Sequence, residues 1–123
     1  MAKFNRLSPV LPVRAIDKAV EFYERLGFKL AFTDMSEPRR YAGVVRDGIE
    51  LDLQWHSEAE FNSCRAGVAM LRLSVDDPDD LHKEYSRQGV LTDKKTIRNT
   101  EWGTREFGVF DPDGNGLTFY KPL

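Results

Sequence analysis

The sequence lacks features that several classes of protein require. Cys64 is the only cysteine among 123 residues, so no disulfide can form within the chain. No apolar run approaches the length of a membrane span, and residues 1–10 lack the apolar core of a signal peptide. We therefore expect a cytoplasmic protein with no membrane partner.

Signs of nucleic-acid binding and of common catalytic chemistry are also missing. The 18 basic and 20 acidic residues give a net charge of −2, which argues against nucleic acid as a partner. His56 and His82 are isolated in the sequence, and Cys64 has no neighbouring histidine. No phosphate-binding glycine loop, nucleophile elbow or HExxH motif occurs. We expect no catalytic residue.

The composition that is present predicts one globular domain, residues 1–123. A hydrophobic content of 41% with 31% charged residues is typical of a globular protein. A chain of this length is expected to bury roughly two-thirds of its unfolded surface in a single domain.

An internal repeat organises the chain. Residues 13–28 return in altered form at residues 75–90, each with a strand end, an acidic turn, an amphipathic helix and a helix-ending glycine. The offset of 62 residues pairs Val13 with Val75, Asp17 with Asp79, Tyr23 with Tyr85, Arg25 with Arg87 and Gly27 with Gly89. Short helices also resemble one another by coincidence, but the preserved spacing of strand, cap and glycine favours duplication.

The closing hairpins repeat as well, at an offset of 66 residues that pairs Asp52 with Thr118. Each half reads as a strand, a helix and about three further strands. We place the pseudo-repeats at about residues 6–56 and 68–123, with a linker at about residues 57–67. The predicted fold class is α+β, with duplicated βαβββ modules that form a curved mixed sheet around a concave ligand cleft.

Two sequence segments resemble those of a known family, AVEFYERLGF at residues 19–28 and FDPDGNGLTFY at residues 110–120. With the duplication, they resemble the vicinal oxygen chelate superfamily, which has the glyoxalase/bleomycin-resistance/dioxygenase fold. The bleomycin-binding branch is the most similar, through SPVLPVR at residues 8–14, YAGVVRDGIEL at residues 41–51 and EWGTREFGVFDPDGN at residues 101–115. The resemblance implies a homodimer with an exchanged N-terminal arm that sequesters a bleomycin-type glycopeptide.

The metal-binding positions of the superfamily's enzymes are filled unusually here. By resemblance they fall at Ser8, Asp52, Met70 and Thr118, with Glu50 an open alternative to Asp52. A hard divalent ion needs several carboxylate or imidazole ligands, and this set offers one carboxylate, two hydroxyls and a thioether. We therefore expect no metal and no cofactor.

The resemblance also implies the ligand-binding residues. In bleomycin-binding proteins a tryptophan before Gly-x-Arg-Glu, here Trp102, stacks on the planar part of the ligand. An aromatic residue at the position of Tyr41 also stacks on the ligand, and Phe32 lies near it in the sequence. Asp52 is placed to attract a cationic group. The alternatives are that Trp102 packs its loop onto the core and that Asp52 is a solvated carboxylate.

Two other functions stay open. One is a metal-dependent lyase, isomerase or transferase of the same superfamily with unusual ligands. The other is a protein that binds a different aromatic metabolite, because aromatic and acidic residues do not specify bleomycin.

Overall fold

Two modules of similar architecture make up the protein. The structure is a computed structural model, and it describes residues 1–63, 69–91 and 97–123. The first module contains β1 (Val10–Val13), α1 (Ile16–Arg25), β2 (Lys29–Thr33), β3 (Tyr41–Arg46) and β4 (Ile49–Trp55). A short helix, α2 (Glu58–Asn62), precedes the second module, which contains β5 (Met70–Ser74), α3 (Pro78–Arg87), β6 (Arg98–Asn99), β7 (Thr104–Phe110) and β8 (Gly116–Pro122).

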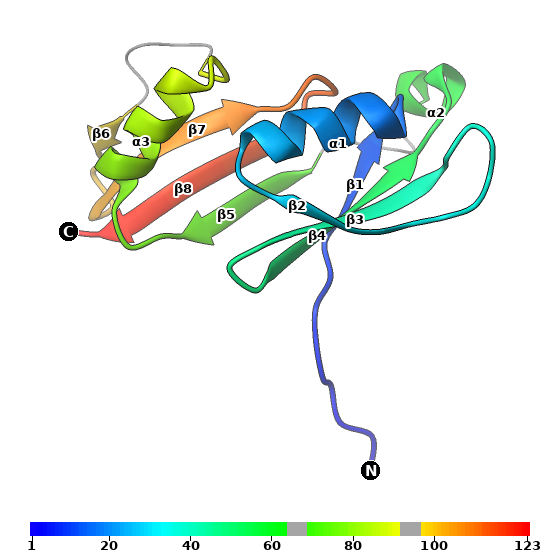
Figure 1. Cartoon of the computed structure of the whole chain (residues 1–123). Coiled ribbons are helices and arrows are strands. Elements are labelled where there is room, and N and C mark those ends of the chain that lie inside the picture. The colour runs from blue at the N-terminus through cyan, green and yellow to red at the C-terminus, as the bar shows by residue number, and fades with distance from the viewer. Residues whose placement is uncertain (64–68, 92–96) are drawn as a thin grey trace.

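The described strands form two four-stranded sheets, which lie side by side in Figure 1. Their orders are β1-β4-β3-β2 and β5-β8-β7-β6, and in each the first strand is parallel to its neighbour while the others are antiparallel. The predicted mixed-sheet α+β class is confirmed. The strand registers also repeat, because Val10 lies opposite Asp52 and Arg72 lies opposite Thr118. These pairs have the offsets of 62 and 66 residues that the sequence suggests.

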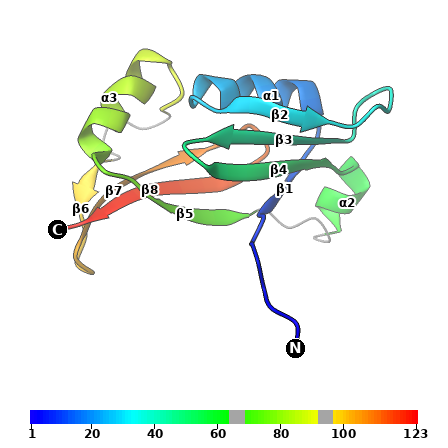
Figure 2. The ribbon, with the colours of Figure 1, turned by 60° about the horizontal axis from the view of Figure 1, so that its bottom comes forward.

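The helix boundaries follow from local chemistry. The sequence predicts Asp77 as the N-cap of α3, because Pro78 after it suits the first helical position. The Asp77 side chain accepts a hydrogen bond of 3.0 Å from the backbone N–H of Asp80, which confirms this cap. After each long helix a glycine turns the chain with a positive φ, +91° at Gly27 and +70° at Gly89, which a residue with a Cβ rarely adopts. These turns return the chain to the sheet that each helix covers (Figures 1 and 2).

The repeated tyrosines join the two modules. The hydroxyl of Tyr23 on α1 donates to Asp111 of the second module at 2.8 Å, and the hydroxyl of Tyr85 on α3 donates to the carbonyl oxygen of Leu26 at 2.7 Å. Both rings are buried within one hydrophobic core that draws residues from both modules. Since a buried hydroxyl needs a partner, each tyrosine fixes the opposite module as well as its own.

The N-terminal strand is shorter than the sequence predicts. The β-branched and proline residues from Leu7 to Val13 predict a strand over that stretch. However, β1 begins at Val10, and residues 1–9 extend away from both sheets (Figures 1 and 2). Phe4 and Leu7 of this arm are exposed. The carbonyl of Pro9 still accepts a hydrogen bond of 2.9 Å from Asp52, so the arm leaves the sheet at this proline.

The predicted linker contains structure that its composition did not predict. Ser57 and Glu60 form a reciprocal capping box that begins α2. The sequence predicts a strand that starts at Val68 and a long loop or ragged strand at residues 91–101. Cys64, Val68 and residues 92–96 lie outside the described residues, while Arg98–Asn99 of the second stretch form β6. No described helix is long and apolar enough to cross a membrane.

One predicted burial pattern is partly wrong. The alternation of apolar and polar residues from Ile49 to Trp55 predicts a strand with one buried apolar face, made of Ile49, Leu51, Leu53 and Trp55. Leu51 and Leu53 are buried, but Ile49 and Trp55 are exposed because they lie at the ends of the strand, beyond the cover of the core. Asp52, from the face expected to be polar, is buried instead.

Candidate functional site

Three of the four predicted ligand-binding residues lie together on one face of the first sheet. Side chains alternate between the faces of a strand, and Leu51 and Leu53 of β4 point into the core. Asp52 therefore lies on the opposite face, next to Gly43 of β3, which in turn pairs with Phe32 of β2.

Tyr41 and Asp52 are directly bonded on this face. The Tyr41 hydroxyl donates to Oδ2 of Asp52 at 2.8 Å. Burial, followed by the hydrogen bond and the charge of Asp52, raises the pKa of Tyr41 to about 12. The phenol therefore remains a neutral donor at physiological pH.

The second oxygen of Asp52 differs from the first in its hydrogen bonding. Asp52 is only 8% exposed, and its Oδ1 makes no hydrogen bond within the described part of the chain. The alternative of a solvated carboxylate is therefore wrong. Glu50, two residues earlier on β4, lies on the same face but is less buried, which makes Asp52 the enclosed carboxylate of the two. An unpaired buried polar atom is costly, so its presence marks a position that a ligand donor can satisfy.

An aromatic pair lies beside this carboxylate. The rings of Phe32 and Tyr41 are stacked, with centroids 6.1 Å apart and planes inclined by 19°. Phe32 covers Gly43 so closely that a Cβ at this glycine would overlap the ring. Phe32 is itself partly exposed, so the pair presents an apolar surface next to the free oxygen of Asp52.

Trp102 lies in the other module, on the turn that connects β6 and β7. Its side chain is 60% exposed, so the alternative that it packs into the core is wrong. The indole Nε1–H donates to Oε1 of Glu106 at 3.1 Å, and the guanidinium of Arg98 lies 5.4 Å from the ring centroid. Trp102 is thus an exposed ring with a hydrogen-bonded edge.

Glu106 is a site residue that the sequence analysis missed. It is 7% exposed and accepts hydrogen bonds from Thr104 at 2.6 Å and from Arg72 at 3.3 Å, in addition to Trp102. Burial acts to raise the pKa of Glu106, but these three hydrogen bonds outweigh it and the net pKa is lowered. The only signal for Glu106 in the sequence is its place at the end of the Gly-x-Arg-Glu segment that follows Trp102.

The metal-equivalent positions of the second module hold side chains with weak affinity for a hard divalent ion. Met70 is exposed and covers Gly116, while Thr118 lies beside Arg72 in the register of the second sheet. Within residues 1–63, 69–91 and 97–123, no group of three or more His, Cys, Asp or Glu side chains is arranged to hold a metal ion. The imidazole of His56 is hydrogen-bonded to the side chains of Glu60 and Gln54.

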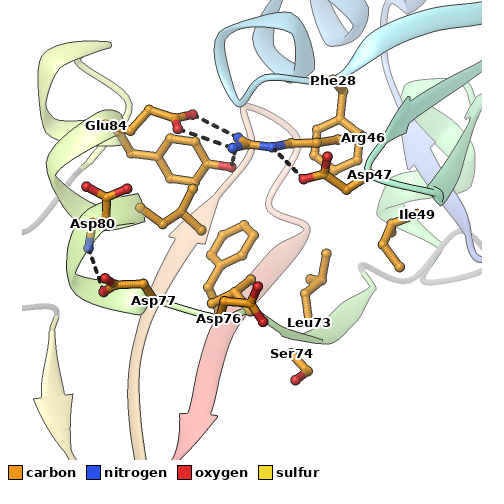
Figure 3. A pocket seen from close by; sticks show the side chains of 14 residues that line it. Phe28, Arg46, Asp47, Ile49, Leu73, Ser74, Asp76, Asp77, Asp80 and Glu84 are labelled. Carbon is orange, nitrogen blue, oxygen red and sulfur yellow. Dashed lines mark hydrogen bonds and ion pairs between the residues drawn. The ribbon is translucent and has the colours of Figure 1, made fainter.

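A cavity of about 470 Å³ lies between the modules rather than on this face (Figure 3). Phe28, Leu73 and Phe119 contribute apolar walls. The guanidinium of Arg46 crosses the cavity to Glu84 at 2.8 Å, which ties β3 to α3. None of the four predicted ligand-binding residues lines this cavity. We interpret it as part of the interface between the two modules.

Comparison with known proteins identifies the family. The chain belongs to the Glyoxalase/Bleomycin resistance protein/Dioxygenase superfamily, whose family model matches residues 3–119. A bleomycin resistance protein of Geobacillus stearothermophilus is 29% identical over 125 aligned residues, which cover 94% of this chain and 95% of the relative.

Solved structures show the same relationship. A bleomycin-binding protein from bleomycin-producing Streptomyces verticillus, complexed with copper(II)-bleomycin, is 33% identical with a TM-score of 0.75 and 97% coverage of both chains. TnmS3, an antibiotic binding protein from Streptomyces sp. CB03234, is 30% identical with a TM-score of 0.76, covering 100% of this chain and 99% of its own. A glyoxalase-related enzyme from Clostridium phytofermentans has a TM-score of 0.78 at 21% identity, which is a similarity of fold.

Proposed function

We propose that this protein binds a bleomycin-type glycopeptide antibiotic and sequesters it without changing it chemically. The relatives named for bleomycin resistance and bleomycin binding support this class of ligand. The observation that carries the proposal is the buried Oδ1 of Asp52, which no described residue bonds, beside the stacked rings of Phe32 and Tyr41.

That arrangement suits a ligand that is both planar and cationic. A flat aromatic group gains roughly 0.5–1.5 kcal/mol from offset stacking on a ring such as Phe32, beyond the burial of its area. A positively charged N–H donor placed next to it would supply the hydrogen bond that Oδ1 of Asp52 lacks, in a charge-assisted form. Trp102 supplies a second exposed ring on the other module.

A homodimer is part of the proposal. The site residues lie on faces of two different modules, and a cleft shared between two copies would bring the Phe32–Tyr41 face of one toward the Trp102 face of the other. The arm of residues 1–9 projects away from its own sheets with Phe4 and Leu7 exposed, which supports its exchange with a partner.

The proposed mechanism needs no metal, cofactor or catalytic residue. Ser8, Met70 and Thr118 are poor ligands for a hard divalent ion, which leaves Asp52 as the sole strong donor of the set. A metal-dependent lyase, isomerase or transferase would require a ligand set that these positions do not supply. If the protein instead bound another aromatic metabolite, that compound would use the same site. Titration therefore decides which compound is the ligand.

The test is bleomycin binding by the wild type and by two matched carboxylate variants. Asp52→Asn keeps the shape of the side chain but removes its charge, and we expect affinity to fall by roughly 1.5–3 kcal/mol. Glu50→Gln, on the same strand and face, is the control and should bind within about twofold of the wild type. Equal affinity of all three proteins would remove Asp52 from the site, and no binding by the wild type would contradict the function.

A further inference from the structure

The structure assigns to Glu106 a positioning role: its buried carboxylate holds the exposed indole of Trp102 in one orientation before a ligand arrives. This inference rests on the proposed function for its purpose, since Trp102 is the ring offered to the ligand. Glu106 itself is 7% exposed and acts through Trp102.

One oxygen of Glu106 is the centre of the arrangement. Its Oε1 accepts from the Nε1–H of Trp102 at 3.1 Å, from the hydroxyl of Thr104 at 2.6 Å and from Nη2 of Arg72 at 3.3 Å. The donors come from the turn before β7, from β7 itself and from β5. The indole is therefore tied to two strands of the second sheet through a single buried acceptor.

The hydrogen bond to Glu106 fixes the edge of the Trp102 ring, in addition to the guanidinium of Arg98, which lies 5.4 Å from the ring centroid. The ring of Trp102 is 60% exposed, and the next residue, Gly103, has a φ of +88° and open space where a Cβ would stand. An exposed side chain loses rotamer freedom when a ligand immobilises it, and that loss reduces affinity. A ring already fixed at its edge by a hydrogen bond has less freedom to lose, and the face that Arg98 does not cover remains available for stacking.

The other contacts of Glu106 explain why it is itself fixed. Arg72 donates to both carboxylate oxygens, and its guanidinium carbon lies 4.4 Å from the centroid of the Tyr120 ring on β8. The carboxylate is therefore held between a cation and a hydroxyl donor, and the lowered pKa of Glu106 keeps it an acceptor at physiological pH. A charged acceptor makes a stronger hydrogen bond to the indole than a neutral one.

A purely structural role would give a different result. If Glu106 only neutralised Arg72 within the sheet, its replacement would lower the free energy of unfolding. The motion of the Trp102 ring would not change. The motion of the Trp102 ring therefore separates the two roles.

The experiment follows that motion in a Trp55→Phe background, which leaves Trp102 as the only tryptophan. Time-resolved fluorescence anisotropy reports the wobble of the indole, and titration with metal-free bleomycin reports affinity. In Glu106→Leu, which removes the acceptor, we expect greater wobble and an affinity about two- to tenfold lower. Glu106→Gln retains an acceptor oxygen and should restore most of the rigidity.

Asp79→Asn is the matched control. Asp79 pairs with Arg105 at 2.8 Å on the opposite face of β7, so this variant also breaks a carboxylate–arginine pair on that strand. It should leave both anisotropy and affinity unchanged. Unchanged anisotropy in Glu106→Leu, or increased wobble without a loss of affinity, would overturn the inference.

A measurement on the unaltered protein covers the case in which Glu106→Leu does not fold. The hydrogen-bonded Nε1–H of Trp102 should exchange with solvent more slowly than an exposed indole, as ¹H–¹⁵N spectra would show, and fast exchange would also overturn the inference. Failure of the unaltered protein to bind bleomycin would contradict only the proposed function. The hydrogen bond between Trp102 and Glu106 would still be detected by the anisotropy and the exchange rate.

Discussion

The ring of Phe32 on β2 lies directly over Gly43 on β3, in a space that only a residue without a side chain leaves open. The same ring is stacked on Tyr41 and partly exposed. The glycine thus lets an aromatic ring approach the sheet closely, next to Asp52, whose Oδ1 has no hydrogen-bond partner among the described residues.

We expect Gly43→Ala to weaken bleomycin binding by roughly 0.5–1.5 kcal/mol, the value of one aromatic stack. The added methyl group would push the partly exposed Phe32 ring outward, so the loss should appear in affinity more than in stability. Gly108→Ala is the control, because Gly108 is the equivalent glycine opposite Thr118 and a Cβ there meets only the carbonyl of Leu117 at 3.7 Å. Equal effects of the two substitutions would contradict a role for the Phe32 ring.

Trp102→Ala should weaken binding by roughly 1–3 kcal/mol, as the loss of an aromatic hot spot does. The free energy of unfolding should change little, because the ring is 60% exposed and a buried aromatic would instead cost about 3–5 kcal/mol of stability. Denaturant unfolding and calorimetric titration of the same variant separate the two effects. A large loss of stability with unchanged affinity would remove Trp102 from the site.

Much of the fold was predictable because local chemistry specifies it. The caps of α3, the glycines after both long helices and the bounds of β3 and β4 follow from residues near each element. The repeat offsets predicted even the equivalence of Asp52 and Thr118, which the strand registers reproduce. These features depend on contacts close in sequence or on the duplication itself.

The site was less predictable because its polar contacts span the chain. Glu106 meets Arg72, which lies on a non-adjacent strand and is 34 residues away in the sequence. Nothing local in either segment indicates that pairing. The burial of Asp52 also depends on which side chains of the neighbouring strands cover it, so the sequence left a solvated carboxylate open as an alternative.

Alkaline pH should destabilise the protein partly through Tyr41. Its pKa in the folded state is raised to about 12 from an ordinary value of 10.0, first by burial and then by Asp52. Below about pH 10 the phenol is protonated in both states, and its contribution is fully present. Between about pH 10 and pH 12 the unfolded chain releases the proton more readily, so the free energy of unfolding should fall as the pH rises.

Urea unfolding of Tyr41→Phe across this range provides the comparison. The variant should lose less stability than the wild type, because one of the groups with a raised pKa is gone. Tyr85, whose pKa is also about 12 through burial, should still make the variant sensitive. Parallel curves for the two proteins would contradict the coupling between Tyr41 and Asp52.

We expect a dimer in solution, with the arm of residues 1–9 contributing to the interface. The basis is the exposure of Phe4 and Leu7 on a segment that leaves its own sheet at Pro9. Light scattering of the full chain should report the mass of two copies at micromolar concentration. A chain that lacks residues 1–8 should dissociate more readily, whereas a monomeric full chain with unchanged behaviour after the deletion would contradict this arrangement.

The most direct test of sequestration is calorimetric titration of purified protein with metal-free and with copper-bound bleomycin, after elemental analysis of the same dialysed sample. Sequestration without catalysis requires saturable binding with a Kd of about 1 μM or lower, equivalent to about −8 kcal/mol. We predict such binding by protein that contains no stoichiometric divalent metal, with the antibiotic recovered unchanged. About one zinc, nickel or manganese per chain, or no heat of binding with either form of bleomycin, would contradict the account.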